Sequence, residues 1–103
     1  MNSRAKLLCI FVDETDCWEQ MPLYEALVRR MMQFGLSGAT VHAGIMGFGR
    51  RQLVHQKRLF GMKDDRPITV MVVEEEEKIR RILPELREMI ADGMIVLLDA
   101  EVI

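Results

Sequence analysis

The residues best suited to chemistry lie in one stretch of the chain, ATVHAGIMGFGRRQLVHQKRLF, at positions 39–60. Three glycines follow its apolar, β-branched beginning, and two arginines come next: Gly44, Gly47, Gly49, Arg50 and Arg51. Because glycine has no Cβ, backbone N–H groups beside it can approach a ligand closely, and adjacent cations attract an anion. The stretch therefore predicts the rim of a phosphate or nucleotide site. The same spacing also fits a strand, a bulge at the glycines and a solvated basic loop.

Hydrophobic periodicity predicts the elements that must position this stretch. Apolar runs of strand length indicate β-strands at residues 6–12, 39–48, 68–73 and 94–102. Between Pro22 and Gly35, apolar side chains recur at helical spacing: Leu23, Leu27, Met31 and Phe34. Proline favours the first position of a helix and glycine favours its end, and a second amphipathic helix begins at Glu74. The order βαββαβ predicts an α+β, ferredoxin-like sandwich with an antiparallel sheet.

Three of the predicted strands are apolar throughout. Residues 7–12, 70–73 and 95–98 contain no polar side chain, whereas a sheet with one wet face would alternate apolar and polar residues. Both faces of the sheet are therefore predicted to be buried. Two helices can cover only one face, so further copies of the chain must cover the other. The pattern predicts a homo-oligomer without giving its number of subunits.

Length and composition exclude several classes of protein. A chain of 103 residues predicts a single domain, 1–103. A net charge of −2 argues against general nucleic-acid binding, and the longest apolar runs are too short to span a membrane. The first residues lack the layout of a signal peptide, and Cys9 and Cys17 have no metal-binding spacing. We therefore expect a cytoplasmic protein that is not membrane-embedded and does not bind nucleic acid.

Other ionisable groups carry weaker signals. Residues 50–66 form a long, net basic connection, whose cations suit either phosphate and partner contacts or solubility alone. The run at 74–77, four glutamates, is interpreted as a solvated helix start with favourable ion pairs four residues apart, not as a metal site. Asp13, Glu14 and Asp16 suit turn and capping roles. No nucleophile, base and acid occur at a spacing that predicts catalysis.

Four motifs together resemble those of a PII-like family known as domain of unknown function 190. They are a Pro-Leu-Tyr-Glu helix start at 22–25, a Gly-Ile-x-Gly-Phe-Gly segment at 44–49, the loop histidine His55 and a Leu-Pro-x-Leu helix at 83–86. The sequence GFGRR at 47–51 is also similar to the Gly-Phe-Gly-Arg-Gln segment at the base of the long T-loop in PII signalling proteins. The resemblance runs from about Lys6 to Ile103, nearly the whole chain.

The resemblance implies a homotrimer whose sheets face inward and which binds an adenine nucleotide between subunits. The ligand would be AMP, ADP or ATP, with or without magnesium. By matching position, the nucleotide-binding residues would be Gly44, Gly47, Phe48, Gly49, Arg50, Arg51, His55 and Gly93. A T-loop-like connection at about 49–66 would contact a regulated partner protein, such as a transporter or channel. The resemblance thus implies a signalling protein without catalytic residues.

Three positions depart from the related patterns. Arg51 stands where PII proteins have glutamine, Met94 replaces a lysine, and Ala43 occupies a position where the closer family tends to carry arginine. Fewer cations near the phosphates imply either weaker binding of a triphosphate or a preference for AMP or ADP. Two alternatives stay open: a metal-responsive or structural trimer without nucleotide, and an acylphosphatase-like phosphohydrolase. The phosphohydrolase needs an arginine in the loop after the first strand, and residues 13–18 contain no cation.

Overall fold

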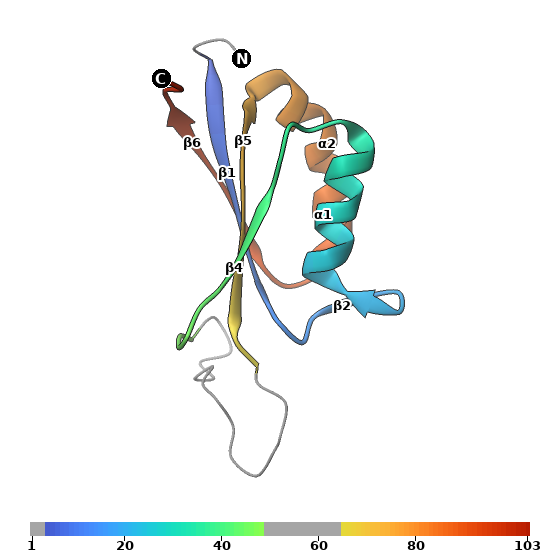
Figure 1. The fold of residues 1–103 in the computed structure, drawn as a ribbon. Coiled ribbons are helices and arrows are strands. Elements are labelled where there is room, and N and C mark those ends of the chain that lie inside the picture. The colour runs from blue at the N-terminus through green and yellow to red at the C-terminus, as the bar shows by residue number, and fades with distance from the viewer. Residues whose placement is uncertain (1–3, 49–64) are drawn as a thin grey trace.

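The computed structural model describes residues 4–48 and 65–103 of the chain. Its elements follow in the order β1 (Ala5–Asp13), β2 (Cys17–Trp18), β3 (Met21–Pro22), α1 (Leu23–Phe34), β4 (Thr40–Ala43), β5 (Pro67–Glu75), α2 (Glu76–Met89) and β6 (Met94–Ala100). Four strands form an antiparallel sheet ordered β4-β5-β1-β6, and β2 pairs with β3 in a small hairpin. Both helices lie on the same side of the sheet (Figure 1). The predicted α+β, ferredoxin-like arrangement is confirmed.

The core lies between the helices and one face of the sheet. Alternate residues of β1 and β5 point to this face because successive strand side chains point to opposite sides. Their buried side chains are Leu8, Ile10, Val12, Ile68, Val70 and Val72. The helices contribute buried residues at helical spacing: Leu23, Ala26, Leu27, Met31, Ile79, Ile82, Leu86 and Met89. Each fully buried large apolar side chain contributes roughly 1.5–3 kcal/mol to folding, so this layer holds the sheet and helices together.

The other face of the sheet is apolar too, and no described part of the chain covers it. Leu7, Cys9 and Phe11 alternate with the core residues of β1. Their partners across β5 and β6 include Val73, Met71, Leu98, Val96 and Met94. Exposed fractions reach 39% for Phe11, 47% for Leu98 and 58% for Met94. The predicted two-sided apolar sheet is therefore present, with one side open in a single chain.

Local signals set the bounds of the first helix. Gly35 has a φ of 102°, a left-handed conformation that glycine adopts without a Cβ penalty. Its N–H donates to the carbonyl oxygens of Met31 and Met32, and the Leu36 N–H also donates to Met31. This ends α1 at the predicted residue. Pro22 was predicted as the first helical residue but stands one position before it, at the N-cap and at the end of β3.

The structure corrects several boundaries. The last strand was predicted over 94–102, but β6 ends at Ala100. The second large strand was predicted over 39–48, but β4 covers only Thr40–Ala43. The third was predicted to stop at Val73, but β5 continues to Glu75 and α2 begins at Glu76. The segment 13–18 was predicted as a loop, yet Cys17–Trp18 forms one arm of the β2–β3 hairpin. In each case cross-strand pairing, which propensity does not encode, decided the end of the element.

Candidate functional site

Four of the eight predicted binding residues lie in the described part of the chain: Gly44, Gly47, Phe48 and Gly93. Gly49, Arg50, Arg51 and His55 lie outside the described residues. The four described residues share one end of the sheet. That end also contains the last residues of β1 and the first residues of β5 (Figure 1).

Gly44 packs directly against the start of β5. Its N–H donates to the carbonyl oxygen of Pro67 at 2.7 Å. A Cβ on Gly44 would lie 2.7 Å from Cγ of Pro67, closer than real Cβ contacts allow. A Cβ on Gly47 would lie 3.3 Å from the same atom. Close approach of the chain to the proline ring therefore favours glycine at position 44, independently of any ligand, whereas the contact at position 47 is only tight.

Beyond β4 the chain presents apolar side chains to solvent. Phe48 is 73% exposed, Met46 62% and Ile45 92%. An exposed aromatic ring beside glycine backbone offers a flat surface for stacking and little steric hindrance around it. The described part of the Gly44–Gly49 segment thus has accessible groups on which a planar ligand could lie.

Gly93 occupies the tight turn between α2 and β6. A Cβ there would lie 2.7 Å from the carbonyl oxygen of Phe11 and 2.9 Å from Cγ2 of Ile90. Because one of these atoms belongs to the backbone of the central strand, it cannot move aside easily. Glycine is therefore needed for the turn to pack against β1, whether or not it also borders a ligand.

The four described candidate residues fall into two groups that are separated within one chain. Gly44, Gly47 and Phe48 follow β4, whereas Gly93 precedes β6, and these two strands form opposite edges of the sheet. Three strand-to-strand steps of about 4.8 Å separate them, roughly 14 Å in all. If the β4 edge of one chain lay beside the β6 edge of another, the two groups would border one cleft.

An ion pair that sequence reasoning missed fixes the end of the long connection. The Arg66 guanidinium donates to both carboxylate oxygens of Glu14, at 2.8 and 3.1 Å. The Glu14 N–H donates to the Arg66 carbonyl oxygen at 2.9 Å, and the Thr15 hydroxyl donates to Asp65. The ferredoxin-like pairing of the first and third strands was the available signal, since it places the residues after β1 beside those before β5. Arg66 therefore anchors the connection.

Glu74 corrects the interpretation of the glutamate run. Its side chain is 3% exposed, lies in β5, and accepts N–H groups from Ser37 at 2.8 Å and Glu75 at 3.0 Å. Burial raises the pKa of Glu74, but these N–H groups outweigh burial and hold the pKa below its ordinary value. Only the later glutamates form the predicted pairs, Glu76 with Arg80 and Glu77 with Arg81. Glu74 is thus a structural acceptor between α1 and β5.

Residues 4–48 and 65–103 contain neither a cluster of metal-ligating side chains nor a membrane-spanning helix. In that part of the chain, no three or more His, Cys, Asp and Glu side chains gather closely enough to hold a metal ion. Neither α1 nor α2 is long and apolar enough to cross a membrane. Cys9 is a free, buried thiol and Cys17 a free, exposed one.

The fold is that of PII-like proteins. It resembles the solved structure of CPII, a nitrogen regulatory PII-like protein from Thiomonas intermedia K12, bound to ADP, AMP and bicarbonate. The TM-score is 0.72 with 19% identity, over 95% of this chain and 87% of that one.

The chain belongs to the DUF190 family, whose model, described as "Uncharacterized ACR", matches residues 5–102. A UPF0166 protein of Aquifex aeolicus is 39% identical over 100 residues, which cover 97% of this chain and 94% of that protein. A UPF0166 protein of Methanocaldococcus jannaschii is 36% identical over 100 residues, covering 96% and 92%. The family suggested by the sequence motifs is confirmed.

Proposed function

We propose that this protein is a non-enzymatic regulatory protein that binds an adenine nucleotide between subunits of a homo-oligomer. The observation that carries the proposal is the division of the candidate residues between the two edges of one sheet. Such a division is expected for a site shared by two copies. The PII-like CPII, which shares the fold, was solved with ADP and AMP bound.

The proposed oligomer is a trimer assembled through the open face of the sheet. Phe11, Leu98 and Met94 expose apolar side chains on this face, and contiguous apolar patches are typical of interaction sites. The helices cover only the opposite face (Figure 1). The resemblance to PII proteins supports three subunits with inward-facing sheets.

The proposed ligand is AMP or ADP in preference to ATP. Among the described segments at this end of the sheet, 13–16, 43–48, 65–67 and 91–94, Arg66 is the one cation, and Glu14 binds its guanidinium. Phosphate charge would therefore fall to Arg50 and Arg51, or to a magnesium ion. Each added phosphate would need a further cation that Met94 and Ala43 do not supply.

In this proposal the chain is a single cytoplasmic domain, 1–103, and its 49–66 connection reports ligand binding to a partner protein. A ligand can change such a segment only through contacts that differ between its two states. Arg50 and Arg51 would make those contacts at one end, while Arg66 is held by Glu14 at the other. The partner would be an enzyme, transporter or channel that contacts the segment.

Titration calorimetry tests the proposal with AMP, ADP, ATP and cyclic AMP, each with and without magnesium. We expect saturable binding of AMP or ADP at micromolar affinity. The double variant Arg50→Ala, Arg51→Ala should bind at least about tenfold more weakly, because each charge-assisted contact contributes roughly 1.5–3 kcal/mol. Its matched control is Arg80→Ala, Arg81→Ala, which removes two exposed cations from α2. Absence of binding by all four nucleotides, or equal affinity in both double variants, would contradict the proposal.

A further inference from the structure

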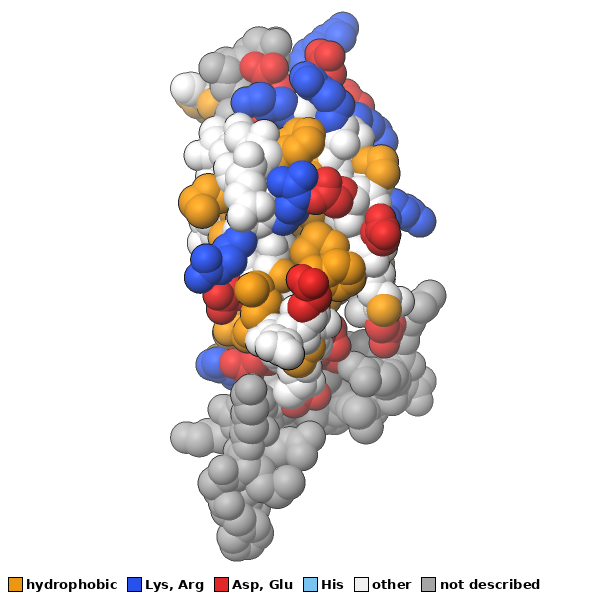
Figure 2. Space-filling model, turned by 90° about the vertical axis from the view of Figure 1, so that its right-hand side faces the viewer, with side chains coloured by type: hydrophobic (Ala, Val, Ile, Leu, Met, Phe, Trp, Pro, Cys, Tyr) orange, Lys and Arg blue, Asp and Glu red, His pale blue; other side chains and the backbone are white. Residues whose placement is uncertain are grey.

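The helix face of the protein contains a concave site that none of the predicted binding residues lines. A cleft of about 360 Å³ lies between α1, α2 and the β2–β3 hairpin. Figure 2 shows this face, with hydrophobic side chains near its middle bordered by acidic and basic ones. Its lining includes three apolar residues, Trp18, Met21 and Met89, that pack against the core.

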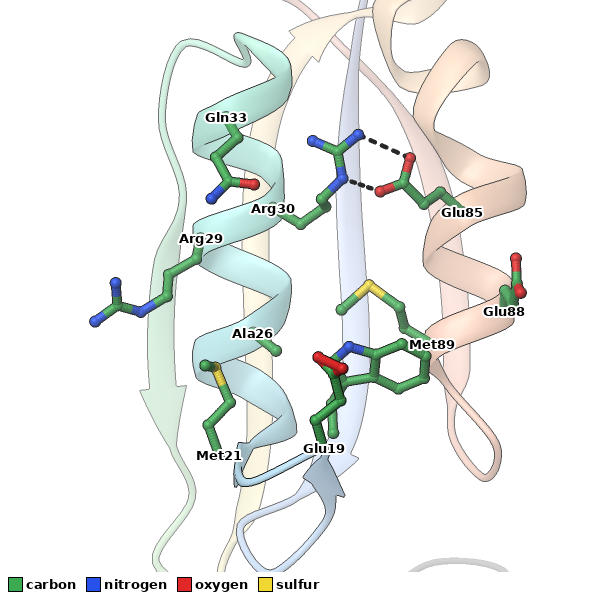
Figure 3. Close-up of a pocket in the computed structure, with 10 residues that line it drawn as sticks. Glu19, Met21, Ala26, Arg29, Arg30, Gln33, Glu85, Glu88 and Met89 are labelled. Carbon is green, nitrogen blue, oxygen red and sulfur yellow. Dashed lines mark hydrogen bonds and ion pairs between the residues drawn. The ribbon is translucent and has the colours of Figure 1, made fainter.

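An ion pair between the helices forms one wall of this cleft. Arg30 on α1 and Glu85 on α2 point toward one another (Figure 3), and the second guanidinium contact measures 3.0 Å. The Arg30 guanidinium also lies 5.8 Å from the ring centre of Phe34. Arg29 pairs with Glu25 and points away from the cleft (Figure 3). Both arginines that line the cleft therefore already form ion pairs within the chain.

Two carboxylates in the lining lack such partners. Glu19 at the hairpin tip and Glu88 on α2 line the cleft, and neither has an ion-pair or hydrogen-bond partner among the described residues. Glu19 has a φ of 56°, the left-handed conformation that glycine favours in a two-residue hairpin turn.

We propose that this cleft is a docking site for an arginine-bearing segment of a partner protein. The guanidinium would be bound by Glu19 and would lie against the Trp18 indole, whose face attracts cations. Glu88, at the outer edge of α2 (Figure 3), would add negative charge at the rim of the cleft. Arg29 is paired with Glu25 and Arg30 with Glu85, so Glu19 and Glu88 leave the lining with a net negative charge. A cationic side chain would complement this charge. The cleft is open along the helix face, whereas small free ligands are usually enclosed on most sides. An open site can accept one side chain of a partner protein while the partner's backbone stays outside the cleft.

This surface stays accessible in the proposed oligomer. The helices lie on the opposite side of the sheet from the open apolar face (Figure 1). Assembly through the open face would therefore leave the cleft on the outside, and a partner could contact it independently of the 49–66 connection.

The single tryptophan of the chain is a direct probe of the site. We would titrate the full chain with capped peptides of about five residues that contain one arginine, or citrulline in its place, and with agmatine. The arginine peptide should change Trp18 fluorescence saturably, and the citrulline peptide should not. The double variant Glu19→Gln, Glu88→Gln should bind the arginine peptide about fivefold more weakly, given the modest strength of exposed ion pairs. Glu77→Gln, an exposed carboxylate on α2 outside the cleft, is the matched control.

Three results would overturn the inference. One is equal response to arginine and citrulline peptides, and another is unchanged affinity in the double variant. The third is agmatine binding as tightly as the peptide, which would assign the cleft to a small amine. Thermal melting checks that each glutamine variant is folded. Nucleotide binding measured on the same variants should be unchanged, so failure here is distinguishable from failure of the proposed function.

Discussion

Gly44 and Pro67 lie in contact where β4 ends and β5 begins, joined by a hydrogen bond of 2.7 Å from the Gly44 N–H to the Pro67 carbonyl oxygen. The proline ring occupies the space that a Cβ on Gly44 would need. The first glycine of the candidate site is thus fixed by packing at the base of the 49–66 connection. A ligand role for the segment must be compatible with this contact.

Gly44→Ala should therefore destabilise the protein. The added Cβ would lie 2.7 Å from Cγ of Pro67, and overpacking of this kind costs roughly 1–3 kcal/mol. Gly38→Ala is the control, because a Cβ at Gly38 would meet no atom within 4 Å. Urea unfolding measures both variants. Equal free energies of unfolding for the two would show that the chain relaxes freely around Pro67.

The Glu14–Arg66 pair should show measurable coupling. The Glu14 side chain is only 15% exposed and is bound through two guanidinium contacts. A double-mutant cycle with Glu14→Ala and Arg66→Ala should give a coupling free energy of about 1–2 kcal/mol. The exposed Glu77–Arg81 pair, at 3.8 Å, serves as reference and should give roughly 0–0.5 kcal/mol. Coupling no larger than the reference would mean that the pair does not anchor the connection.

Glu74 should contribute an acid-sensitive part of the stability. Because its pKa is lower in the folded protein than its ordinary value, the ionised form stabilises the fold above that ordinary value. This stabilisation is lost as the pH falls through the folded pKa. Glu74→Gln should lower the free energy of unfolding by about 1–3 kcal/mol at neutral pH. The NH2 group of the glutamine would face one of the two backbone N–H groups that the carboxylate accepts. The deficit should shrink as the pH falls below the ordinary pKa of a glutamate and then through the lower pKa of the folded protein. A deficit independent of pH would refute the assignment.

The open sheet face should control assembly rather than folding. Leu98 lies on this face and is 47% exposed in the single chain. Leu98→Asp should give a folded chain of monomer mass by light scattering, whereas the wild type should have the mass of an oligomer. Met32→Asp, at a 68% exposed position on α1, should keep the wild-type mass. Val72→Asp buries a charge in the core and should abolish folding or assembly. An oligomeric Leu98→Asp protein would place the interface elsewhere.

Much of the fold was predictable because it rests on local patterns. The apolar runs of β1, β5 and β6, the helical spacing of α1 and the stop at Gly35 are properties of neighbouring residues. Glu74 and Glu14 were assigned less well because their roles depend on distant partners, Ser37 and Arg66. Likewise the β2–β3 hairpin is too short for a period of two residues to be visible in the sequence.

The sequence by itself determined the ferredoxin-like order, the family and the apolar character of both sheet faces, because hydrophobic period and short motifs are written in consecutive residues. Only the tertiary structure decided that Gly44 and Gly93 lie on opposite edges of the sheet, that Pro67 requires a glycine at position 44, and that a cleft opens beside Trp18. These relationships depend on strand order and on side chains far apart in the chain. Hydrophobic pattern constrains which face a residue occupies, but not which distant residue it meets.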